Sequence, residues 1–94
     1  SADPGLLRII ARAHDLQERL RHNKDLTVQS LAAQERVSAG YVSRLLRLPS
    51  LAPDIITAIL NGRTPPQLTA KKLMHLAPKI PVGWPEQRAM LGFS

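Results

Sequence analysis

The chain has 94 residues, 13 of them Lys or Arg against 7 Asp or Glu, and it has no cysteine. The length fits one small domain, and the 44% hydrophobic content argues against a disordered chain. The lack of cysteine excludes a disulfide scaffold or a thiolate metal site, and no apolar run approaches the roughly 20 residues that cross a bilayer. We therefore expect a cytoplasmic protein without a membrane partner, whose formal charge of +6 favours a polyanionic partner.

A first amphipathic helix is predicted from Asp3 or Pro4 to about Arg21. The apolar residues are mostly Leu, Ile and Ala, aromatic residues make up only 3% of the chain, and this balance favours helices over strands. Apolar residues at i, i+3, i+4 spacing form one face: Leu6, Ile9, Ile10, Ala13, Leu16 and Leu20. The opposite face carries a basic stripe with two acids among the arginines, so we expect these charges to pair with each other rather than bind phosphate; they are Arg8, Arg12, Asp15, Glu18 and Arg19.

Two short helices are predicted in the middle of the chain. Thr27 is the expected N-cap of a helix over about Val28 to Glu35, and Ser38 is the expected N-cap of a helix from Ala39 to about Arg47. Pro49 is expected to end the second of these helices because proline lacks the N–H that a helix interior needs.

Residues 27–48, TVQSLAAQERVSAGYVSRLLRL, resemble the helix-turn-helix signature. Leu31 and Ala32 provide an apolar residue followed by a small one, which lets two helices cross closely. Val37 follows the turn and is expected to reach the core. Arg36 occupies the turn position at which the motif prefers glycine, so we expect the turn to form at some cost in strain.

Three further helices are predicted after residue 52. The first begins at Pro53 and presents an apolar stripe, the second is capped by Thr69, and the third spans about Pro85 to Leu91. We expect the last helix to dock on the core through Trp84, Met90, Leu91 and Phe93. The sequence thus predicts one all-α domain over residues 3–94, with about five or six helices and a central helix-turn-helix.

In a helix-turn-helix the second helix enters the major groove of DNA, so we expect this position for the helix predicted from Ala39. Gly40 inside a helix costs ~1 kcal/mol relative to Ala, and close approach to DNA would explain it. The plainer alternative is that the fold tolerates Gly40 and that the arginines face only water. We predict DNA contacts from this helix and its cap, from the preceding helix and from the fifth helix, namely Ser38, Ala39, Gly40, Ser43, Arg44, Arg47, Gln29, Lys71 and Lys72.

Catalysis and cofactor binding find little support in the sequence. The three histidines, His14, His22 and His75, have no cysteine and no second carboxylate at metal-ligand spacing. No glycine-rich loop follows a strand, so a phosphate cradle is not expected. We predict that this chain is not an enzyme by itself, and that it binds no metal or cofactor.

Several stretches together resemble the C-terminal region of bacterial serine recombinases of the resolvase/invertase class. The most specific are SAGYVSRLLRLPSLAPDIITAILNGR and WPEQRAMLGF, and the resemblance runs from about Leu6 to Phe93. It implies a parent protein with an N-terminal catalytic domain that carries a serine nucleophile and is absent here. This chain would then be the targeting module, binding duplex DNA and assembling with other copies there. The DNA-contacting role that the resemblance implies applies to the second helix of the motif and its cap, namely Ser38, Ala39, Gly40, Ser43, Arg44 and Arg47.

Two alternatives remain open. The helix-turn-helix and the segment after it are also similar to the DNA-binding domain of the partition protein ParB and its repressor relatives, and the sequence upstream of Ser1 would separate that parent from a recombinase. The second alternative is a helical protein–protein adaptor, in which an apolar groove would be formed by Ile55, Ile56, Ile59 and Leu60.

Overall fold

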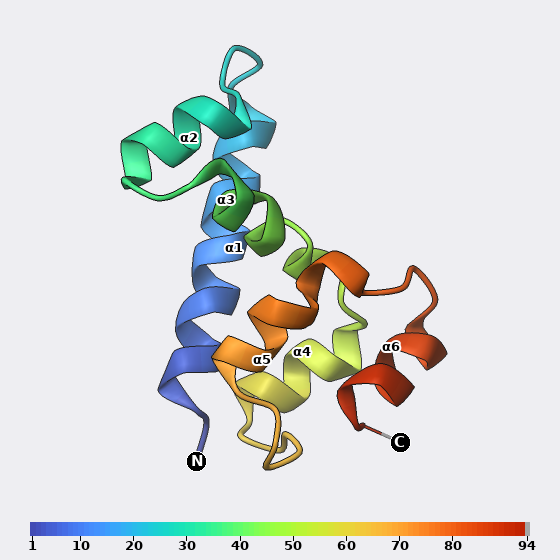
Figure 1. Ribbon diagram of the computed structural model, residues 1–94. Coiled ribbons are helices and arrows are strands. Elements are labelled where there is room, and N and C mark those ends of the chain that lie inside the picture. Colours follow the sequence, from blue (N-terminus) through green and yellow to red (C-terminus); the bar gives the residue numbers. More distant parts are fainter. Residues whose placement is uncertain (94) are drawn as a thin grey trace.

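A long N-terminal helix, α1 (Pro4–His22), is the element around which the rest of the chain packs (Figure 1). The chain is described by a computed structural model that covers residues 1–93. The Asp3 carboxylate begins α1 by accepting hydrogen bonds from the backbone N–H groups of Gly5 and Leu6, and Pro4 occupies the first turn, where its missing N–H costs nothing. The predicted apolar face is confirmed, since α1 buries Leu6, Ile9, Ile10, Ala13 and Leu16.

Helices α2 (Val28–Glu35) and α3 (Ala39–Leu45) lie across the upper end of α1 (Figure 1). Both N-caps are confirmed. Thr27 forms a reciprocal capping box with Ser30, and the Ser38 hydroxyl accepts a hydrogen bond from the backbone N–H of Tyr41. α2 and α3 pack against each other more extensively than any other pair of elements.

The second half of the chain folds against the lower part of α1. It consists of the 3₁₀ turn η1 (Leu48–Ser50), α4 (Pro53–Leu60), α5 (Ala70–Leu76), the 3₁₀ turn η2 (Ala77–Lys79) and α6 (Trp84–Leu91). Residues 1–93 thus contain six α-helices and no strand, which confirms the predicted all-α domain. The last residue of that predicted domain, Ser94, lies outside the described residues. No helix within residues 1–93 has the length and apolar character to cross a membrane.

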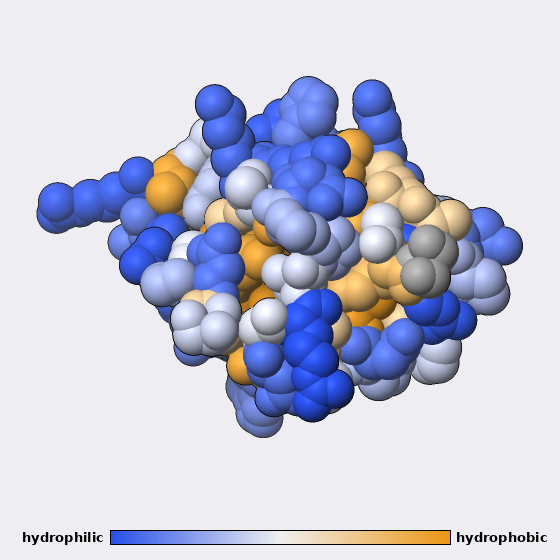
Figure 2. All heavy atoms as spheres, turned by 90° about the horizontal axis from the view of Figure 1, so that it is seen from below, coloured by the Kyte–Doolittle hydropathy of each residue, from blue (hydrophilic) through white to orange (hydrophobic). Residues whose placement is uncertain are grey.

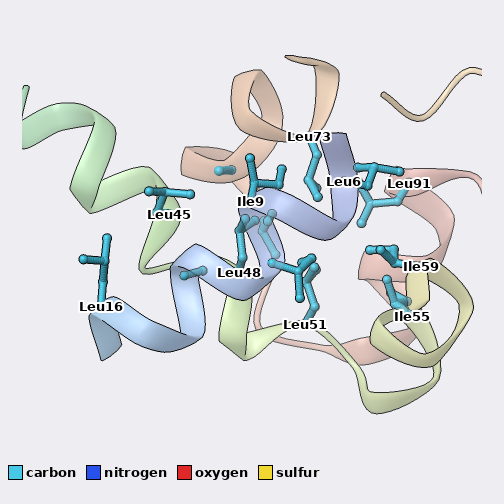
Figure 3. Packing of buried hydrophobic residues seen from close by; sticks show 14 of the residues in the cluster. Leu6, Ile9, Leu16, Leu45, Leu48, Leu51, Ile55, Ile59, Leu73 and Leu91 are labelled. Carbon is cyan, nitrogen blue, oxygen red and sulfur yellow. The ribbon is translucent and has the colours of Figure 1, made fainter. Parts of the chain in front are cut away.

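One core joins both halves of the molecule. Figure 3 shows leucine and isoleucine side chains from η1, α3, α4, α5 and α6 packed along α1, and Leu31 and Ala32 of α2 belong to the same core. Ile55 and Ile59 of α4 are 0% and 1% exposed, so half of the apolar stripe predicted as a groove for an adaptor partner is core. Leu60, the last residue of α4, is exposed. Seen from below, the surface shows hydrophobic residues among hydrophilic ones (Figure 2).

The predicted C-terminal boundary of the third helix is wrong. α3 ends at Leu45 rather than near Arg47, and Pro49 lies inside η1 instead of ending α3. The backbone N–H of Arg47 bonds to the carbonyl of Arg44, three residues back, so the last turn tightens before proline is reached. This tightening turns Leu48 into the core, where it is fully buried.

The predicted docking of the last helix is also wrong in one residue. Trp84 is half exposed rather than a core anchor, whereas Leu91 is buried and Met90 and Phe93 pack partly against the core. The main polar anchor of α6 is Gln87, which is 1% exposed. Its Oε1 accepts a hydrogen bond from the backbone N–H of Ala52, and its Nε2 donates to the carbonyls of Ser50 and Pro81.

Candidate nucleic-acid interface

The turn between α2 and α3 has the geometry that the sequence predicts. Arg36 adopts a left-handed conformation with φ 58° and ψ 43°, and it is the one non-glycine residue with positive φ within residues 1–93. The Val37 N–H closes the turn on the carbonyl of Ala32 at 3.0 Å. Leu31 and Ala32 are buried at the crossing, as predicted. The three-residue turn thus fixes α3 across α2, leaving the opposite face of α3 free.

The free face of α3 consists of small and basic residues. Gly40, Ser43 and Arg44 are exposed, whereas Ala39 is half buried and packs against the core. Ser38 is exposed, and its Oγ accepts the N-cap hydrogen bond from the Tyr41 N–H while its O–H remains available as a donor. A Cβ at Gly40 would meet only the Ser38 Oγ, at 3.9 Å. Packing within the domain therefore gives no reason for a glycine at this position.

The two arginines predicted to contact DNA differ in how they are held. Arg44 forms no ion pair with any residue among 1–93. Arg47 has no carboxylate partner there either, but its Nη2 donates a hydrogen bond to the carbonyl of Ile80 at 2.9 Å. Guanidinium has five N–H donors, so Arg47 keeps donors for a ligand while its position is fixed.

The structure places Lys71 and Lys72 on different sides of α5. Lys71 lines a groove of about 450 Å³ together with Arg44 of α3 and His75, and Tyr41 also lines it. Lys72 lines a separate groove between α5 and α6. Of the two predicted lysines, only Lys71 therefore lies beside the exposed face of α3. His75 was not among the predicted DNA contacts, although its i, i+4 spacing from Lys71 puts both on one helical face.

Gln29 lies apart from these residues along the chain, in the first turn of α2. Its side chain is exposed and forms no hydrogen bond with residues 1–93. The structure therefore leaves Gln29 available to a ligand but gives no contact that joins it to Arg44 or Lys71.

Charge is unevenly distributed along the chain. Residues 1–35 contain five basic and five acidic side chains, whereas residues 36–94 contain eight basic and two acidic ones. The two acids are Asp54, which pairs with Arg88 at 3.0 Å, and Glu86. The whole formal charge of +6 thus belongs to the part of the chain that follows α2.

The predicted pairing of charges on α1 holds for Arg12 and Arg19 but not for Arg8, which forms no ion pair with residues 1–93, and the main acidic partner lies on another helix. Glu35 of α2 bonds to Arg19 at 3.1 Å and to Arg12 at 3.3 Å, and Arg19 also contacts Asp15. The hydrogen bond from Arg19 is the main reason that the pKa of Glu35 is lowered, and the same bond raises the pKa of Arg19. Arg12 also lies 5.6 Å from the centre of the Tyr41 ring of α3, so it links all three helices.

Within residues 1–93 no cluster of three or more His, Asp or Glu side chains could hold a metal ion.

No protein-family model, curated protein or solved structure matches the chain.

Proposed function

We propose that this chain binds duplex DNA in a sequence-dependent manner, with α3 in the major groove. The observation that carries the proposal is the exposed face of α3, where Gly40, Ser43 and an unpaired Arg44 face open space at the second helix of a helix-turn-helix. Small residues let the backbone approach the groove, and an arginine can bind the O6 and N7 atoms of guanine. Lys71, beside Arg44, is placed to neutralise a phosphate at the edge of the same groove.

Double-stranded DNA fits this surface better than RNA or a protein partner. The major groove of A-form RNA is too deep and narrow for an α-helix, and RNA recognition commonly uses several exposed aromatic rings, of which this chain has few. An adaptor surface on α4 would have to work without Ile55 and Ile59, because both lie in the core.

We further propose that the chain is the targeting module of a site-specific serine recombinase, whose catalytic domain is another part of the same protein. The support is the sequence resemblance over Leu6 to Phe93. On this proposal the chain holds DNA while the catalytic domain cuts it, so the purified chain shifts the mobility of a supercoiled plasmid but leaves it uncut, with or without magnesium. A nicked product that a serine substitution abolishes would overturn this assignment. The sequence upstream of Ser1 separates a recombinase from a ParB-like parent.

Selection of bound duplexes from a randomised pool, followed by titration of the selected site, tests the DNA-binding proposal. We expect Arg44→Ala to weaken binding to the selected site by ~1–3 kcal/mol. The affinities for selected and scrambled duplexes should therefore become more alike. The matched control is Arg63→Ala, which removes an exposed arginine from the loop after α4. The proposal is wrong if no duplex is enriched and none binds at low salt. It is also wrong if both variants lose the same binding free energy on every duplex.

A further inference from the structure

The loop between η2 and α6 and the first residue of α6 each expose one large apolar side chain to solvent. Val82 is 93% exposed and Trp84 is 50% exposed, and together with Leu60 they are the large hydrophobic residues most exposed within residues 1–93. The loop projects from the body of the molecule (Figure 1). Val82 and Trp84 line a hollow of about 410 Å³, with Arg47 also at its wall. A clustered apolar surface of this kind is more informative than single exposed leucines.

This loop is anchored at its base. Ile80 is 4% exposed, and its carbonyl accepts the hydrogen bond from Arg47. The next carbonyl, that of Pro81, accepts a hydrogen bond from the buried Gln87 at 2.9 Å. Proline also restricts the backbone here. The fold therefore presents Val82 and Trp84 outward from fixed positions, which reduces the entropy lost when they contact a ligand.

Arg47 lies between this hollow and the exposed face of α3. Arg47 lines this hollow, and it also lines a smaller one of about 210 Å³ with Ser43, Arg44 and Pro78. No acidic side chain lines either hollow. The sequence has no acid between Asp54 and Glu86. A ligand seated on α3 would thus reach Val82 and Trp84 past Arg47. The exposed Glu86 carboxylate lies over Gly83, between the two apolar residues, so the contact depends on Arg47 to offset this acid.

We propose that Val82 and Trp84 form a second contact with the duplex bound by α3. Both side chains would pack against deoxyribose of a DNA strand that borders the major groove, and Arg47 would bind the adjoining phosphate of that strand. This inference rests on the proposed function of α3. A DNA backbone fits the surface because it alternates anionic phosphates with apolar sugar faces, which match a cation beside two apolar side chains. A protein partner on this loop is the competing occupant, and it would leave DNA binding independent of both side chains.

Trp84 is the only tryptophan of the chain, so its fluorescence reports directly on the loop. We would titrate the whole 94-residue chain with a fluorescently labelled 30-base-pair duplex, recording anisotropy of the DNA and emission of Trp84 together. Acrylamide quenching, compared between the free and the bound protein, measures the accessibility of the ring. If the proposal is right, Trp84 emission changes in parallel with anisotropy, and acrylamide quenches the bound form less.

Val82→Asp tests the contact without a change in the core, because Val82 is almost fully exposed. The new carboxylate would face phosphate, and we expect affinity to fall by more than about tenfold. Leu60→Asp is the matched control, since it also replaces an exposed aliphatic residue with an acid, at the C-terminal end of α4. We expect it to change affinity less than about twofold, because charges more than ~10 Å apart are screened at 0.1 M salt.

The outcomes separate this inference from the function on which it rests. If the duplex binds and Arg44→Ala weakens it, but Trp84 stays equally accessible and Val82→Asp binds like Leu60→Asp, the loop contact is wrong and the function of α3 stands. If no duplex binds the wild-type chain, the proposed function fails and the loop contact fails with it.

Discussion

The segment over α1 and α2 and the segment that follows it use charge in opposite ways. In residues 1–35 basic and acidic side chains are equal in number, and Glu35 is bonded to both Arg12 and Arg19. In the remainder basic residues dominate, and Arg44 and Lys71 line one groove without an acidic partner. Paired charges of this kind hold helices together, whereas a concentration of unpaired cations favours an anionic ligand. The comparison predicts that substitutions in the first segment change mainly stability, and those in the second mainly DNA affinity.

Gly40→Leu should give the largest effect in the second segment. We expect DNA affinity to fall by on the order of 3 kcal/mol or more, because a branched side chain would lift α3 from the groove and remove more than one base contact. Stability should stay equal or rise by up to ~0.8 kcal/mol, since leucine favours helix over glycine and the space around Gly40 is open. Thermal midpoint and affinity are measured on the same variant. A loss of stability with unchanged affinity would mean that Gly40 serves packing instead.

Lys71→Gln and Lys72→Gln sharpen the comparison within one helix. These variants carry the same charge change, but only Lys71 shares a groove with Arg44. Removing one phosphate contact should reduce the slope of log K against log salt by about 0.9 and weaken binding several-fold at low salt. We expect this change for Lys71→Gln and a slope like that of the wild type for Lys72→Gln, in titrations at four or more salt concentrations. Equal slopes for both variants would contradict the position proposed for the DNA.

Arg12→Ala tests the first segment. Arg12 contributes an ion pair to α2 and a cation–π contact to α3, so we expect a loss of ~1 kcal/mol in the free energy of unfolding. Any loss of DNA affinity should be small and equal for selected and scrambled duplexes, because Arg12 is not on the exposed face of α3. Urea denaturation and the two titrations measure these quantities. A selective loss for the selected duplex would place Arg12 in the interface.

Local features of the fold could be predicted from the sequence, whereas contacts between distant segments could not. Caps such as Ser38 and the turn at Arg36 depend on neighbouring residues, and the structure confirms both. The contacts of Gln87 join residues up to 37 positions apart, and no periodicity signals them, since glutamine is usually exposed. Trp84 was predicted to dock the last helix on the core, but it is half exposed. Its real position depends on how η2 and the following loop are anchored.

The same limit applies to the candidate interface. Helical spacing identified Gly40 and Arg44 as exposed, and the structure agrees. Lys71 and Lys72 were predicted together as DNA contacts because they are adjacent in the sequence. Successive residues of an α-helix point about 100° apart, however, so the two side chains face different directions. That Lys71 lies beside α3 follows only from the packing of α5, which is a tertiary contact.

The smallest effect we predict is the pH dependence that Glu35 gives to stability. The hydrogen bond from Arg19 lowers the pKa of Glu35 in the folded chain below its ordinary value of 4.5. A lowered pKa stabilises the folded state at pH values above the ordinary one, and this stabilisation disappears as the pH falls through the lowered value. Glu35→Gln removes the titrating group, so the stability advantage of the wild type over this variant should be full at pH 7 and should shrink below about pH 4.5. Urea denaturation at several pH values measures the advantage.

Asp25→Asn is the matched control for this experiment, because Asp25 is exposed in the loop before α2 and its carboxylate forms no ion pair with residues 1–93. Its stability relative to the wild type should change little with pH. DNA affinity at pH 7 should be the same for both variants and the wild type once all are folded, since Glu35 faces α1 rather than the exposed side of α3. If the difference between Glu35→Gln and the wild type does not depend on pH, the ion pairs of Glu35 with Arg12 and Arg19 contribute nothing measurable to stability. The contrast between paired and unpaired charge would then hold only for DNA binding.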